Sequence, residues 1–342
     1  QACDLANLKG QHQRLYNAAL EQRILSYQSD KKSLSYYDQC KQLTLLRQEE
    51  PDYGRINAQS LQVTLKRLDL AFSHFFRRCS QGEGKVGFPR FKSFSRFAGF
   101  GYKSHGDGWR FESGEDGCHG RLKLSSIGWI SLRGRPRKNP LTGERMVGQP
   151  KTLEVFFKAG QWYASITFKQ ELPVRLKGDQ TIAFDWGVSS YLTLINEEQE
   201  CSLCKNPRHL QQSLDRIKGL QKSLSRKMKG SKNYEKCRQA LSQLHQKVVC
   251  QRNHFTHELS AQLIAQSATL VTESLKIQPM LQHHQPVFSK GLHRSIADTA
   301  VAGFLDKLRY KAEEAGVSFK ELPTKRLKPS QRCSLCGKLE KK

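Results

Sequence analysis

Residues 1–82 carry apolar side chains at the three- and four-residue spacing of amphipathic helices. The clearest stripe runs from Leu61 to Phe76, and the opposite face of that segment is basic. We predict a helical domain over residues 1–82, in which the apolar stripe forms the core. Arg77 and Arg78, at the end of the stripe, are candidate contacts to phosphate.

The helical pattern ends at a glycine-rich stretch, after which aromatic and basic residues alternate. The sequence GFPRFKSFSRFAGFGY occupies residues 87–102. Rings interleaved with positive charge suit base stacking and phosphate contact, and Arg90, Lys92 and Arg96 are candidate nucleic-acid contacts. The alternative is that the rings anchor a loop on the protein core.

Residues 105–177 change to a period of two, which is typical of half-buried strands. The alternation is clearest in Leu153–Phe157 and Trp162–Phe168. Gly160, between these two runs, predicts a tight hairpin. We expect a small antiparallel β-barrel or sandwich over this range.

A new unit begins near residue 178. The apolar run Thr181–Phe184 predicts a buried strand, and Asp185 follows it directly. Gly187 permits a turn into a second run, Tyr191–Ile195. The pattern predicts a hairpin that presents the Asp185 carboxylate.

Two long amphipathic helices are expected over residues 205–265, with a turn at residues 230–233. Basic residues gather around this turn, and Lys222, Arg226 and Lys227 are candidate nucleic-acid contacts. The same charge would equally suit a solvated helix face, so both interpretations stay open.

The pattern then predicts a short strand over residues 269–275 that contains Glu273. A polar loop over residues 276–294 and a helix over residues 295–315 follow, and Gly316 is suited to end the helix. A last strand is expected at residues 317–322. The chain is therefore expected to be an α/β multidomain protein.

The charge of the chain narrows the class of partner. The 342 residues include 57 Lys and Arg against 31 Asp and Glu, which gives a net charge of +26. A field of this size favours a polyanion such as nucleic acid. A basic protein that is merely soluble, or one that binds a membrane surface, is the alternative. No stretch approaches the roughly 20 apolar residues that cross a bilayer, so no membrane partner is expected.

The ten cysteines are not arranged as the disulfide framework of a small secreted domain. Six are isolated, and four form two CxxC pairs, Cys201/Cys204 and Cys333/Cys336. This usage favours a reducing cytoplasm and metal-type pairs. No signal peptide is visible, although the chain begins at Gln1 rather than Met.

Two sets of residues are candidate metal ligands. Asp185 and Glu273 stand at strand ends and, if they converge, offer the hard oxygen ligands that suit Mg²⁺ or Mn²⁺. An acid in this position is more often a helix cap or a solvated end. Cys333 and Cys336 have the spacing of half a zinc site, to which Cys201 and Cys204 could add the other half. The alternative is that the pairs are free thiols.

In order and spacing, seven segments resemble the TnpB family of transposon-encoded proteins over nearly the whole chain. Arg14–Arg23 resembles the first helix of the family, Leu61–Arg77 followed by Gly87–Lys92 the second helix and its exit, and Leu122–Trp129 a strand pair. Ile182–Gly187 resembles the first RuvC motif, Thr272–Leu275 the second, and Pro329–Gly337 the start of the zinc ribbon.

The resemblance implies a helical recognition domain at 1–82, a β-barrel wedge domain at 83–177 and an RNase H-like RuvC nuclease domain at 178–327 with a helical insertion at 205–265. A zinc ribbon would begin at 328–342. It also implies RNA-guided DNA cleavage by a prokaryotic, nucleoid-associated protein with guide RNA and target double-stranded DNA as partners. Asp185 and Glu273 would be catalytic and bind Mg²⁺ in two-metal hydrolysis, and Cys333 and Cys336 would bind Zn²⁺.

Three features depart from the family pattern. The N-terminal strand that usually precedes the first helix is not found, and residues 338–342 contain neither a second CxxC nor a third catalytic Asp. With two of three acids the chain is expected to bind metal poorly and to cleave weakly or not at all, unless another acid such as Asp298 completes the site. A guided DNA binder that does not cut and a DNA-joining transposase are the alternatives.

Overall fold

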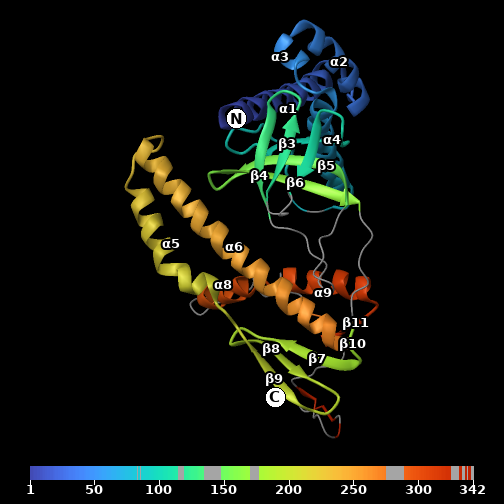
Figure 1. Ribbon diagram of the computed structural model, residues 1–342, viewed down its shortest axis with the longest axis vertical. Helices are drawn as coiled ribbons and strands as arrows, with labels where there is room; N and C mark the ends of the chain where they lie inside the picture. Colours follow the sequence, from blue (N-terminus) through green and yellow to red (C-terminus); the bar gives the residue numbers. More distant parts are fainter. Residues whose placement is uncertain are drawn as a thin grey trace. The chain divides into compact units, whose positions relative to one another are not determined.

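The computed structural model describes residues 1–82, 84, 86–114, 119–134, 148–169, 177–274, 289–324, 331–332, 336 and 338–339. The chain divides into two compact units, Gln1–Leu172 and Pro173–Lys342. Each unit combines helices with sheet, so the expected mixed α/β architecture is confirmed (Figure 1). No helix in the described part of the chain is long and apolar enough to span a membrane.

The first unit begins with four helices, and local capping fixes the starts of two of them. Ser35 and Asp38 form a reciprocal capping box, and Asn57 accepts a hydrogen bond from the Ser60 amide. These caps satisfy amide groups that would otherwise lack partners. The helices are α1 (Ala2–Asp30), α2 (Tyr36–Glu49), α3 (Pro51–Gly54) and α4 (Ala58–Ser80).

The β part of the first unit contains two three-stranded antiparallel sheets. The predicted hairpin at Gly160 is confirmed, because Ala159 and Gly160 both have positive φ, 50° and 83°, as a two-residue turn between twisted strands requires. Closure of the two sheets into a barrel stays a prediction. One sheet has the order β1 (Gly99–Tyr102), β5 (Gln149–Lys158), β6 (Gln161–Lys169), and the other β2 (Trp109–Ser113), β3 (His119–Leu124), β4 (Gly128–Arg133).

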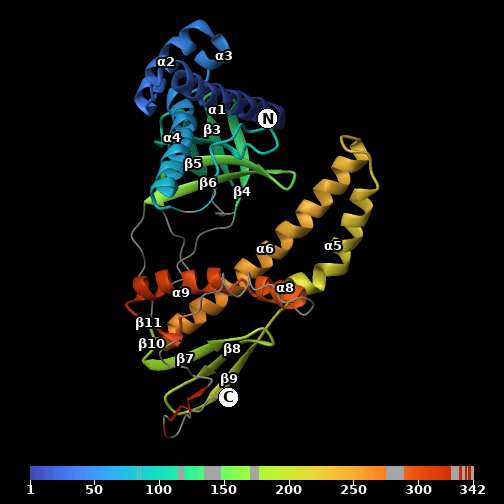
Figure 2. The ribbon, with the colours of Figure 1, turned by 180° about the vertical axis from the view of Figure 1, so that it is seen from behind.

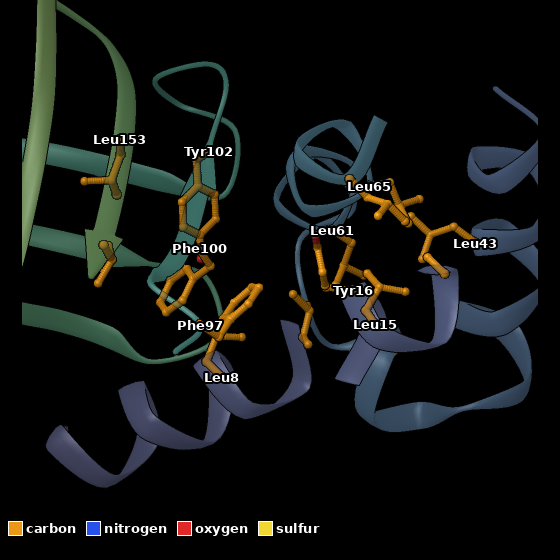
Figure 3. Close-up of a cluster of buried hydrophobic side chains, with 14 of the residues drawn as sticks. Leu8, Leu15, Tyr16, Leu43, Leu61, Leu65, Phe97, Phe100, Tyr102 and Leu153 are labelled. Carbon is orange, nitrogen blue, oxygen red and sulfur yellow. The ribbon is translucent and has the colours of Figure 1, made fainter. Parts of the chain in front are cut away.

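One hydrophobic core joins the helices and sheets of the first unit. Figure 3 shows Leu8 of α1 beside Phe97 and Phe100, with Tyr102 and Leu153 on neighbouring strands. Leu61 and Leu65 of α4, which are at most 2% exposed, continue the same core between the helices. The segments predicted as a helical domain and a β domain are therefore packed on each other.

The second unit is built on a five-stranded mixed sheet with the order β11-β10-β7-β8-β9. The first three strands in sequence form an antiparallel meander, and β10 and β11 then add in parallel on the other side of β7. The hairpin predicted around Gly187 is thereby confirmed. The strands are β7 (Gln180–Trp186), β8 (Ser190–Ile195), β9 (Cys201–Lys205), β10 (Ser267–Glu273) and β11 (Ser318–Leu322).

Helices α6 (Lys232–Gln266) and α9 (Val301–Ala315) cover one face of this sheet, as both views show (Figures 1 and 2). Leu263 of α6 and Phe304 of α9 pack against Ile182 and Phe184 of β7. Helix α5 (His209–Ser225) pairs with α6 in a hairpin that projects from the sheet, within the segment expected to be helical.

The single helix predicted over residues 295–315 is wrong. Two helices, α8 (Ser289–Thr299) and α9, are separated at Ala300, which has a φ of 51°. The buried Tyr191 hydroxyl donates to the Thr299 carbonyl oxygen at 3.1 Å, and this bond satisfies an acceptor that the break leaves without a helical partner. The apolar spacing continues through the break, so periodicity alone did not reveal it.

Candidate functional site

The two predicted carboxylates lie side by side at the C-terminal ends of two adjacent strands in the second sheet. Strands β7 and β10 are parallel, and their last recorded pair joins Phe184 to Thr272. The next residues on the two strands are Asp185 and Glu273. Adjacent strands are about 4.8 Å apart, so the two side chains leave the sheet as neighbours.

Both carboxylates belong to the face of the sheet opposite to helices α6 and α9. Residues Phe184 and Trp186 on either side of Asp185 are buried in the helix-covered core, whereas Asp185 is exposed. Because side chains alternate along a strand, Asp185 and Glu273 point away from that core. Thr193 of β8 and Leu322 of β11 are the residues opposite them on the flanking strands.

The surroundings of Glu273 favour its protonated form. Partial burial raises the pKa of Glu273, and the neighbouring Asp185 charge raises the pKa further, while a hydrogen bond from Thr324 acts in the opposite direction. Two adjacent carboxylates repel each other unless a proton or a cation lies between them. The pair is therefore a favourable place for positive charge.

The donor set fits a hard divalent cation such as Mg²⁺ or Mn²⁺, because both groups offer anionic oxygen. Among the residues that the structure describes, no group of three or more His, Cys, Asp or Glu side chains is arranged to hold a metal ion. Two carboxylates are thus the protein ligands that the described part of the chain brings together here.

Asp298, considered from the sequence as an additional acid, has a different role. Its side chain is 6% exposed and pairs with Arg252 of α6 at 2.8 Å. Its two oxygens also accept hydrogen bonds from the amides of Leu210 and Gln211 at the start of α5, at 2.8 and 3.1 Å. Asp298 therefore caps α5 from α8 and links both helices to α6. These interactions use both oxygens of its carboxylate.

The pair Cys201/Cys204 lies on strand β9 and cannot act as a chelating pair there. Cys204 is opposite Leu192 and packs against the core, while Cys201 is opposite Ile195 and exposed. Residues three apart on a strand point to opposite faces. Burial also raises the pKa of the Cys204 thiol, which disfavours the thiolate that zinc requires.

Of the predicted zinc ligands, Cys336 is exposed and Cys333 lies outside the described residues. The predicted zinc ribbon and the polar loop over residues 276–294 also fall largely outside them. Both stay predictions.

The aromatic and basic loop after α4 is anchored on α1. The side-chain amide of Asn17 accepts from the Lys92 amide at 2.9 Å and donates to the Lys92 carbonyl oxygen at 3.0 Å, and Gln13 donates to the same oxygen. The buried Lys9 ammonium lies 4.3 Å from the centre of the Phe94 ring. These contacts fix the loop backbone without using its basic side chains.

Some rings of this loop anchor it in the protein core, and others are exposed and available for base stacking. Phe97 and Phe100 are at most 5% exposed and belong to the core. Phe88, Phe91 and Phe94 are 45%, 54% and 47% exposed. Arg90 and Arg96 are exposed, and Lys92 is half-buried. The loop thus presents rings and positive charge to solvent from a fixed backbone.

The other predicted basic residues occupy helix ends. Arg77 and Arg78 are exposed in the last turn of α4, where Arg77 contacts His74 at 3.0 Å. Lys222 and Arg226 are exposed and Lys227 is half-buried at the end of α5, near the tip of the α5–α6 hairpin. The two groups belong to different units.

Sequence reasoning missed Thr193 and Thr324 beside the carboxylates, because both become neighbours only through strand pairing. It also missed a ring and several basic residues on β2, β3 and β4. The alternation of His119, Arg121 and Lys123 was visible, but their partner Trp129 is set by the register of β3 with β4.

Comparison with known proteins places these features in context. A family model described as "OrfB_IS605: Probable transposase" matches residues 165–284, which include both carboxylates. A protein of Streptomyces pristinaespiralis named "Putative RNA-guided DNA endonuclease" is 27% identical over 347 residues, covering 98% of this chain and 77% of its own length. A protein of Escherichia coli K12 named "Putative RNA-guided DNA endonuclease InsQ" is 25% identical over 352 residues, covering 98% of this chain and 80% of its own length.

The fold also resembles a solved structure. The cryo-EM structure of a Cas12f1-sgRNA-target DNA complex superposes with a TM-score of 0.60 at 12% identity, covering 98% of this chain and 75% of that chain. At this identity the likeness concerns the fold alone.

Proposed function

Because the chain belongs to the TnpB family of transposon-encoded proteins, we propose that it is an RNA-guided DNA endonuclease with a metal-dependent RuvC-type site. Relatives that carry this activity in their names align over nearly the whole chain. A guide RNA and a target double-stranded DNA are then its partners, with sequence read by base pairing.

The observation that carries the proposal is the adjacency of Asp185 and Glu273 at the ends of parallel strands. These residues would hold Mg²⁺ or Mn²⁺ through their carboxylate oxygens. Such ions, when bound, activate a water nucleophile and stabilise the leaving oxygen of a phosphodiester. Asp185, which is exposed, provides the anionic ligand that is most accessible to substrate, and Glu273 provides the second from a more enclosed position.

Each domain of the chain would then have its own role. Residues 1–82 would act as a helical recognition domain, residues 83–177 as the wedge, residues 178–327 as an RNase H-like nuclease domain, and residues from 328 onward as the start of a zinc ribbon held by Cys333 and Cys336. The five-stranded mixed sheet with its covering helices supports the third assignment. The exposed bases of the loop and of the α5–α6 tip would contact nucleic-acid backbones.

The test is cleavage by the purified chain with its co-purifying RNA, Mg²⁺ and matched double-stranded DNA. The described residues bring two carboxylates together and no third, so we expect weak cleavage by the unaltered chain. This cleavage should be lost in Asp185→Ala and in Glu273→Ala, with RNA binding retained. Asp179→Ala, at the opposite end of β7, is the matched control and should cleave normally. RNA-dependent DNA binding without cleavage in the unaltered chain would contradict the endonuclease and identify a guided binder.

The description of the matching family as a probable transposase supports a second candidate, the joining of DNA ends. A strand-transfer assay with transposon-end DNA separates the two. Joined products that depend on Asp185 would favour this candidate, whereas cleaved but unjoined DNA would exclude it.

A further inference from the structure

The sheet β2–β3–β4 has one face in the core of the first unit and the other in solvent. Trp109, Leu122 and Leu124 on the inner face are at most 2% exposed. The positions between them form a single outer surface, because side chains alternate along a strand. This surface, which we call the Trp129 face, carries Arg110, Glu112, Arg121, Lys123, Trp129 and Arg133, all of them exposed.

Strand register gathers positive charge around the Trp129 ring. Lys123 is directly opposite Trp129, and Arg110 is opposite Lys123 on the third strand. The guanidinium of Arg121 lies 5.0 Å and the ammonium of Lys123 5.8 Å from the ring centre. These contacts orient the indole while 36% of Trp129 stays exposed.

The one acidic side chain of the Trp129 face does not neutralise its basic residues. Glu112 pairs with Arg121 at 2.7 Å. Within the described ranges, Arg110, Lys123 and Arg133 form no ion pair with a carboxylate. An exposed ring in a positive field is complementary to a polyanion that carries flat aromatic groups, whereas a purely apolar partner would leave the charges desolvated.

We propose that the Trp129 face binds a single-stranded segment of nucleic acid, with one unpaired base stacked on Trp129. Lys123, Arg110 and Arg133 contact the flanking phosphates. A base inside a duplex has no free face to offer the indole, and this selects a single strand over a double helix. The inference rests on the proposed function only in taking nucleic acid as the ligand, since the face lies in a different unit from the carboxylate pair.

Tryptophan fluorescence of the full chain tests this site directly. The chain has four tryptophans, of which Trp109 and Trp186 are 2% and 8% exposed. We titrate the protein with 12-nucleotide oligo(U), oligo(dT) and a blunt DNA duplex. Both single strands should quench the emission, and the quench should disappear in Trp129→Phe but persist in Trp162→Phe, the matched control on β6. Comparison of the RNA and DNA strands identifies which is preferred.

Affinity provides the second readout. Trp129→Ala should weaken single-strand binding at least about fivefold. Lys123→Glu and Arg133→Glu should each remove about one phosphate contact. The slope of the logarithm of the binding constant against the logarithm of the salt concentration should therefore become shallower by about one. Unchanged quenching in Trp129→Phe, or equal quenching by the duplex, would overturn the assignment.

Cleavage assays on the same variants separate this site from the endonuclease. Guided cleavage by a chain without Trp129-dependent quenching refutes the Trp129 face alone. Trp129-dependent quenching in a chain that does not cleave refutes the endonuclease and supports the face.

Discussion

Burial raises the pKa of Glu273, and the charge of Asp185 on the neighbouring parallel strand raises it further, although the two residues are separated in the sequence by β8, β9 and the whole α5–α6 hairpin. Their proximity is produced by the β7–β10 ladder, whose register ends one residue before each carboxylate. Two consequences can be measured without any assay of cleavage.

Metal should stabilise the folded chain through this pair. A ligand that binds only the folded state adds about 1.4 kcal/mol at ten times its Kd. We expect Mg²⁺ or Mn²⁺ to raise Tm in the unaltered chain and in Asp179→Asn, but not in Asp185→Asn or Glu273→Gln. An equal shift in all four proteins would show that the cation binds elsewhere.

Without metal, Glu273→Gln should be more stable than the unaltered chain at pH 7. The folded pKa of Glu273 is raised, so the folded state holds its proton more tightly, and stability falls as pH rises from the unfolded pKa of about 4.5 through the folded value. Gln removes this loss. Thermal melts across pH should show an advantage that vanishes below about pH 4.5. An advantage independent of pH would contradict the electrostatic cause.

The buried pair of Asp298 and Arg252 should be costly to break. Asp298→Ala leaves the Arg252 charge without its partner and removes the cap from α5, so we expect a loss of about 3 kcal/mol in the free energy of unfolding. The double variant with Arg252→Ala should lose less than the sum of the two single variants. Additive losses, measured by urea unfolding, would mean that the pair is not coupled.

His12 should make the first unit sensitive to acid. Burial, followed by the nearby Arg67 charge, lowers its pKa to about 3, and its ring bonds to Thr64 at 2.8 Å and stacks on Phe100. Its contribution to stability is complete above the unfolded pKa of 6.5 and is lost as pH falls toward the folded value.

Below pH 6.5, this residue alone should reduce stability by about 1.4 kcal/mol per pH unit. His12→Gln keeps a polar group without the titration, so its denaturation midpoint should depend less on pH between 6.5 and 4. The same pH dependence in both proteins would assign the effect to other groups.

Asn17 should matter for nucleic-acid binding although it lies behind the basic loop. Asn17→Ala removes two hydrogen bonds to the Lys92 backbone and frees the loop that carries Arg90 and Phe91. We expect weaker RNA binding with little change in Tm, measured by fluorescence anisotropy and thermal melts. Glu21→Ala, an exposed change on the same helix, is the control. Unchanged RNA affinity would show that the loop needs no anchor.

Local pattern was sufficient for many elements of this fold. The strand before Asp185, the turn at Gly160 and the α5–α6 hairpin depend on short-range periodicity and turn chemistry, which the sequence displays directly. The positions of both carboxylates at strand ends were visible for the same reason.

Other features depend on which segments pair. Strand β9 forms because β8 offers it an edge, and this pairing separates Cys201 from Cys204. The break at Ala300 is supported by Tyr191 from a distant strand. The ring and bases of the Trp129 face become neighbours through register, which no local pattern encodes.

The topology of the second sheet also orders the assembly of the chain during synthesis. Strands β7, β8 and β9 follow one another in the sequence, so their pairing closes only short loops. Strand β10 can pair with β7 only after α5 and α6 have been synthesised. A nascent chain that ends before β10 therefore contains Asp185 without Glu273. The carboxylate pair is completed only after β10 has left the ribosome and joined β7.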